Sequence, residues 1–104
     1  MSAPHPTVIN LPIDAAALPE AWRSRVVGRV GPCAIKIIRM DEAGIDWEDH
    51  PDYEEALYVL DGRMELEIPG ERITCGPGDL YVVPAGVPHR VLPGSHGLLL
   101  LIDR

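Results

Sequence analysis

Two segments of the chain place histidines and carboxylates close to glycines and prolines. The first runs from residue 47 to 62 and contains Glu48, His50 and Glu55, and the second runs from residue 78 to His89. Imidazole nitrogens and carboxylate oxygens bind divalent transition metals, and a site inside a small β-barrel draws such ligands from separate strands. The two segments together therefore predict a metal site.

The alternation of side chains along a strand allows two interpretations of the first segment. Asp46, Glu48 and His50 share one face of an extended segment, and Ile45 and Trp47 lie on the other. The polar face points either into water or into a barrel around an ion.

Glu55 raises the same question for the next strand. It has the parity of Leu57 and Val59, which we expect to point into the core. A glutamate on that face is costly to bury unless it is paired or bound to a cation. At the open end of the strand it would simply be hydrated.

The second segment has the spacing Gly-x5-Pro-x-Gly-x2-His, which begins at Gly78 and ends at His89. Gly86 permits a tight turn, and Pro84 and Pro88 stiffen it, so His89 would be held in a fixed direction on the following strand. A hairpin that needs glycine and proline for its own geometry, with His89 incidental, is the alternative.

Most of the chain has the pattern of short β-strands. We expect strands near residues 33–38, 45–49, 56–60, 64–68, 73–74, 80–83, 89–92 and 98–102. About eight strands joined by tight turns predict an antiparallel sandwich or barrel. Asp61-Gly62 is predicted to be the hairpin turn between two of them. The last strand is apolar on both faces, so the N-terminal arm or a second subunit is expected to cover the face that does not meet the core.

The N-terminal region is expected to be an arm with a short helix. Residues 1–12 are predicted to be extended, with Val8-Ile9 as a candidate edge strand. Asp14 is predicted to cap a helix that ends near Trp22.

Composition excludes several classes of partner. The 104 residues suit one domain, and the net charge of −7 gives no overall attraction for nucleic acid or an anionic membrane. No secretory signal is visible and Leu98–Ile102 is too short to span a bilayer, so we expect a cytoplasmic protein. Cys33 and Cys75 are expected to be unreactive thiols rather than a disulfide.

The two segments resemble the two motifs of the cupin superfamily, in its small single-domain form. The second segment matches at Gly78, Pro84, Gly86 and His89, with Pro93 where the family usually has asparagine.

The first segment matches at Glu55 and Gly62. His50 stands where the family has the second histidine of its His-x-His pair, and Glu48 stands where it has the first. In an alternative register, His50 is the first histidine and Asp52 replaces the second.

The resemblance implies an all-β fold, an antiparallel jelly-roll (cupin) β-barrel with a short N-terminal arm or helix. It implies one domain over residues 1–104, with the arm and helix over 1–25 and the barrel over 30–102. It also implies a divalent metal ion, Mn²⁺, Fe²⁺, Ni²⁺ or Zn²⁺. Carried over residue by residue, the ligands are Glu48, His50, Glu55 and His89.

The resemblance implies oxygenase- or isomerase-type chemistry at this metal on a small polar metabolite. The competing hypothesis is a non-catalytic barrel that binds or senses a small ligand, so whether the chain is an enzyme stays open. In either case the expected partners are a small molecule and a second copy of the chain. In that homodimer Val8-Ile9 would pair with an edge strand of the partner.

Overall fold

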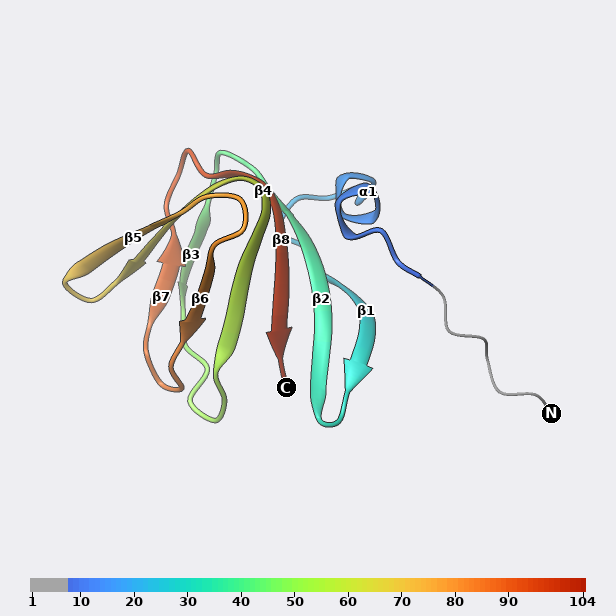
Figure 1. The fold of residues 1–104 in the computed structure, drawn as a ribbon. Helices are drawn as coiled ribbons and strands as arrows, with labels where there is room; N and C mark the ends of the chain where they lie inside the picture. The colour runs from blue at the N-terminus through green and yellow to red at the C-terminus, as the bar shows by residue number, and fades with distance from the viewer. Residues whose placement is uncertain (1–7) are drawn as a thin grey trace.

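The computed structural model of the protein describes residues 8–104, and this part of the chain forms one short helix and eight strands. The strands curl around a shared core in a mostly antiparallel barrel (Figure 1), which confirms the predicted all-β fold. The elements are α1 (Leu11–Ala16), β1 (Arg25–Val30), β2 (Cys33–Met40), β3 (Ile45–Glu48), β4 (Glu55–Ile68), β5 (Glu71–Cys75), β6 (Leu80–Val83), β7 (His89–Val91) and β8 (His96–Asp103).

Strand β4 belongs to both sheets of the barrel. Its first half pairs with β6 and β8, and β8 continues through β2 to β1. Its second half pairs with β5 and β7, and β7 continues to β3. The metal donors predicted from the two segments therefore come from both sheets.

The predicted hairpin at Asp61-Gly62 is wrong, because β4 runs through these residues without a turn. Gly62 has a φ of +84°, and a Cβ there would overlap the carbonyl of His96 on β8. Gly97 has a φ of +109°, and a Cβ there would overlap the carbonyl of Asp61. The two glycines let the backbones of β4 and β8 approach closely, at a point where the pairing shifts between Val59 and Asp61.

The helix lies earlier than predicted. Asn10 caps α1 by accepting a hydrogen bond from the backbone N–H of Ile13, and the helix ends at Ala16. Pro12 is tolerated in the first turn, where a backbone N–H has no helical partner. Asp14 therefore lies inside the helix and is not its cap. Val8-Ile9 forms no strand in the chain, and the rest of the predicted arm, residues 1–7, lies outside the described residues.

Helix α1 covers part of the outer face of β8. Ala15 and Leu18 pack with Ile37 and Leu98 in a small cluster separate from the main core, and Leu100 lies against it. The predicted cover over the second face of β8 is thus partly provided by the N-terminal region. Strand β1, over residues 25–30, was not expected from the sequence and widens this sheet.

The main core fills the closed half of the barrel. Val59, Met64 and Leu66 are fully buried there, and Met40 and Cys75 are nearly so. Both cysteines are free thiols, and Cys33 is half-buried at the start of β2. Within residues 8–104, no helix has the length and apolar character needed to cross a membrane.

Candidate metal centre

A β-bulge in β3 directs Glu48 into the barrel. Ile45 pairs with Val91 and Glu48 pairs with His89, so three steps along β3 match two steps along β7. The extra residue changes the alternation, and Ile45 and Glu48 face the same cavity. The predicted common face of residues 46, 48 and 50 is therefore wrong for Asp46, which is exposed at the surface.

The turn before β7 positions both histidines. Gly86 adopts a φ of +78°, and its backbone N–H donates to the carbonyl of His50 at 3.0 Å. Val87 N–H donates to Pro84 O at 3.2 Å within the same turn. This hydrogen bonding ties the two motif segments together, and the fixed turn leads directly into His89.

The four predicted donors converge on one point. Glu55 Oε1 lies 3.3 Å from His89 Nε2, and Glu55 Oε2 lies 3.7 Å from His50 Nε2. Glu48 Oε2 lies 3.7 Å from His50 Nε2. Ligand atoms of Glu48, His50 and His89 all lie within 4.8 Å of one another. Glu55, Leu57 and Val59 are buried and alternate with less buried neighbours, as their parity predicted.

The histidine nitrogens in this cluster fit a metal ion. The Nε2 atoms of His50 and His89 are buried and have no hydrogen-bond partner in the described part of the chain. The Nδ1 of His89 lies 3.1 Å from the Val87 carbonyl, to which it can only donate. That hydrogen bond places the proton on Nδ1 and leaves the lone pair of Nε2 directed at the carboxylates. Metal-binding histidines usually have this arrangement.

Tyr53 holds the other imidazole. Its hydroxyl lies 3.1 Å from His50 Nδ1, and the two rings stack with centroids 5.1 Å apart. A tyrosine three residues from a histidine would usually be interpreted as a packing residue. The structure instead makes Tyr53 a positioning residue for His50, and it lines the same cavity.

The Glu55 carboxylate shifts the pKa of its neighbour His89. The Glu55 carboxylate beside the ring raises the pKa of His89, while burial acts in the opposite direction and the Val87 carbonyl adds to the increase. The same position beside Glu55 suits a cation, and a divalent ion bound there would compete with a proton for Nε2.

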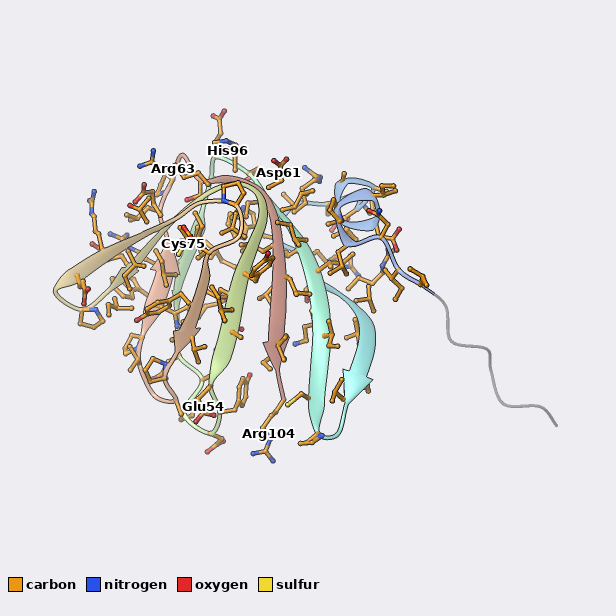
Figure 2. The ribbon with its side chains drawn as sticks, viewed as in Figure 1. Glu54, Asp61, Arg63, Cys75, His96 and Arg104 are labelled. Carbon is orange, nitrogen blue, oxygen red and sulfur yellow. The ribbon has the colours of Figure 1, made fainter. Side chains whose placement is uncertain are left out.

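The other polar residues considered lie elsewhere. Asp52, the alternative replacement for the missing histidine, is exposed in the turn before β4, so the geometry supports the register that uses Glu48. His96 is exposed at the opposite end of the barrel, together with Asp61 and Arg63 (Figure 2). Arg90 pairs with Glu67 at 2.6 Å and lies over the Trp47 ring.

The donors open onto a cavity of about 200 Å³ between the two sheets. Its wall on one sheet carries Glu48, His50 and His89, and its wall on the other carries the inward residues of β2 and β8. Leu57, Ile38 and Leu99, which belong to the main core, form its apolar floor. The cavity is thus lined by both polar and apolar side chains.

The cupin domain model matches residues 37–101, which is more than half of the chain. This chain belongs to the cupin family. The matched span begins in β2 and ends in β8, and it contains all four donors.

Two curated relatives of this cupin are dioxygenases. The chain is 45% identical to the quercetin 2,3-dioxygenase of Bacillus subtilis (strain 168) over 47 residues, which are 45% of this chain and 14% of that protein. It is 29% identical to the acireductone dioxygenase of Tuber melanosporum (strain Mel28) over 84 residues, which are 75% of this chain and 49% of that protein. The cupin thus spans less than half the length of either relative.

A solved structure has the same fold. The cupin-2 domain containing protein from Shewanella frigidimarina superposes with a TM-score of 0.84 at 24% identity, over 91% of this chain and 92% of that one. This agreement extends the likeness beyond the matched span to almost the whole cupin.

Proposed function

We propose that this cupin binds one divalent metal ion through Glu48, His50, Glu55 and His89, and acts on a small polar metabolite there. The observation that supports the proposal is the pair of buried Nε2 atoms of His50 and His89, which have no hydrogen-bond partner among residues 8–104 and lie near the carboxylates of Glu48 and Glu55. Two imidazoles with one or two carboxylates form the donor set of facial metal sites that keep positions open for a substrate. Mn²⁺, Fe²⁺, Ni²⁺ and Zn²⁺ all suit these donors.

When bound, the metal would supply Lewis acidity and a place for the oxygen atoms of the substrate. Residues of the chain would orient the metal ligands and restrict the entry of water. Tyr53 holds the His50 ring, the Val87 carbonyl fixes the His89 ring, and the apolar floor limits how many water molecules enter. We propose oxygenase- or isomerase-type chemistry, and the two dioxygenase relatives support the first.

One feature favours the alternative, a barrel that binds or senses a small ligand without changing it. Glu48 stands where the family usually has a histidine, and its side chain is 41% exposed. A second carboxylate makes the site nearly neutral with a divalent ion, which lowers the Lewis acidity of that ion. A metal ion of low Lewis acidity can still bind a ligand through the oxygen atoms of that ligand.

Oxygen uptake and product analysis distinguish these functions. The protein is loaded with Fe²⁺, Mn²⁺, Ni²⁺ or Zn²⁺ and incubated with small diols, hydroxy acids and keto acids. We expect turnover of one of these classes, and loss of that turnover after EDTA treatment. If ligands bind equally well with and without metal and no product forms, the enzymatic proposal is wrong and the binding barrel is supported.

We also propose that the cupin is a cytoplasmic homodimer, as the sequence led us to expect. Leu80 and Val82 of β6 are 60% and 48% exposed on the outer face, and Ile102 of β8 is also exposed. Ala56 pairs with both Val82 and Ile102, so these side chains form one apolar row across three strands. A second copy packed on this row would remove it from water. Pairing of Val8-Ile9 with a partner's edge strand stays a prediction.

Light scattering at micromolar concentration tests the dimer. We expect a mass of twice the 11.4 kDa chain, and about the mass of one chain for Val82→Asp, because a carboxylate in an apolar interface is costly. Glu54→Gln, an exposed site outside the row, serves as control. A wild-type protein of 11.4 kDa would contradict the proposal.

A further inference from the structure

The wall of the cavity opposite the histidines carries a second charged group. Lys36 of β2 and Asp103 of β8 both line the cavity, and Lys36 Nζ lies 2.8 Å from Asp103 Oδ1. The side chain of Lys36 is 25% exposed and that of Asp103 is 5% exposed. Lys36 is the only lysine in the chain. None of the four metal donors pairs with it among the described residues.

The strand register places this pair beside the metal centre. Ala56 of β4 pairs with Ile102 of β8, so Glu55 and Asp103 are the next residues on these strands, and both are buried on the inner face. Lys36 lies on the far side of Asp103, because β8 separates β2 from β4. The three side chains thus follow one another along one wall of the cavity.

A contribution to the stability of the fold does not by itself explain the Lys36–Asp103 ion pair. Taking two charges out of water is costly, and an apolar pair of similar size often stabilises a core equally well. Asp103 Oδ1 has no hydrogen bond in the described part of the chain, so charge rather than hydrogen-bond geometry holds the ammonium. An ammonium has three N–H donors, which leaves donors for a group inside the cavity.

We propose that Lys36 determines specificity, by binding the distal carboxylate of a small acid whose other end is held at the metal centre. Asp103 positions the ammonium. The inference rests on the proposed metal site and adds the substrate class. The cavity of about 200 Å³ holds the volume of roughly six or seven water molecules. That volume suits a short dicarboxylic acid, and a lysine ammonium is a suitable partner for its far end.

Calorimetry with a matched pair of ligands tests this assignment. Malate and its 4-amide share the 2-hydroxy acid that would bind the metal, and they differ only in the charge at the far end. We expect the Mn²⁺-loaded wild type to bind malate about 10-fold more tightly than the amide, the ratio of one charge-assisted hydrogen bond. Lys36→Met should reduce the preference below about 2-fold, and Lys36→Arg should keep part of it.

Two controls make the result specific. Arg104 is an exposed cation at the same end of the barrel as Glu54 (Figure 2), so Arg104→Met removes one positive charge from outside the cavity and should keep the preference. The double variant Lys36→Met, Asp103→Asn removes the carboxylate that Lys36→Met leaves unpaired, and it should behave as Lys36→Met does. A preference for malate that survives in folded Lys36→Met would overturn the proposal, as would a wild type without any preference.

A metal-independent signal separates this proposal from the metal site. Incorporation of ¹⁵N-lysine labels a single side chain, because Lys36 is the only lysine. We expect its Nζ resonance to shift on addition of malate, and to shift less on addition of the amide at the same concentration. Metal content measured on the same sample reports on the metal site alone. A protein without metal whose Lys36 signal still responds to malate would contradict the metal site and keep the role of Lys36. A metal-loaded protein whose Lys36 signal does not respond to malate would contradict the role of Lys36 and leave the metal site supported.

Discussion

Replacing His89 with alanine should lower the affinity for a divalent metal by more than about 100-fold. Removal of a residue that only hydrogen-bonds a metal ligand already lowers metal affinity about 10–100-fold, and His89 is proposed as a ligand itself. His89 is buried, and its Nε2 faces Glu55 with no hydrogen-bond partner in the described chain. Within residues 8–104, the other candidate ligands considered do not replace it, because Asp52 and His96 are both exposed and outside the cluster. Protein purified without chelator should contain about one metal ion per wild-type chain and close to none for His89→Ala.

Elemental analysis and a competition titration with a chelating dye measure both quantities. His96→Ala is the matched control, because it removes an imidazole from the opposite end of the barrel and should keep full metal content. His50→Ala should behave as His89→Ala does. Stoichiometric metal in the double variant of His50 and His89 would end the proposed metal site.

The second large effect concerns the crossing of β4 and β8. Gly97→Ala should destabilise the fold by about 3–5 kcal/mol, which combines the strain of a positive φ with the overlap of the new Cβ and the Asp61 carbonyl. Backbone atoms on both strands form this contact, so no side chain can rotate away to relieve it. Urea unfolding followed by tryptophan fluorescence gives the free energy of unfolding.

Gly70→Ala separates strain from overlap. Gly70 has a φ of +78°, and nothing lies within 4 Å of a Cβ built there. Its substitution should therefore cost only about 1–2 kcal/mol. Equal losses for the two variants would mean that the close approach of β4 and β8 contributes nothing to the specific cost at Gly97.

The family resemblance grouped Glu48, His50, Glu55 and His89, and the structure places these four side chains around one point. For His89 the local sequence suffices, because glycine and proline fix the turn that leads into its strand. That turn covers only residues 84–88, between β6 and β7, so a short segment contains the information it needs.

The features that could not be predicted depend on contacts between distant residues. Asp61-Gly62 has the composition of a hairpin turn, but the approach of Gly97, distant in the chain, keeps β4 continuous. The bulge in β3 is defined only by its pairing with β7. Lys36 was not recognised because β2 buries an apolar side chain on each face, Ile37 on one and Ile38 on the other, so the parity of Lys36 alone could not show which face lines the cavity.

The shared strand β4 also determines how far this cavity extends into the barrel. Its inner residues change from Glu55 and Leu57, which line the cavity, to Val59 and Met64, which belong to the fully buried core. The cavity therefore stops where that core begins. Any enlargement in this direction would have to remove side chains that hold the two sheets together.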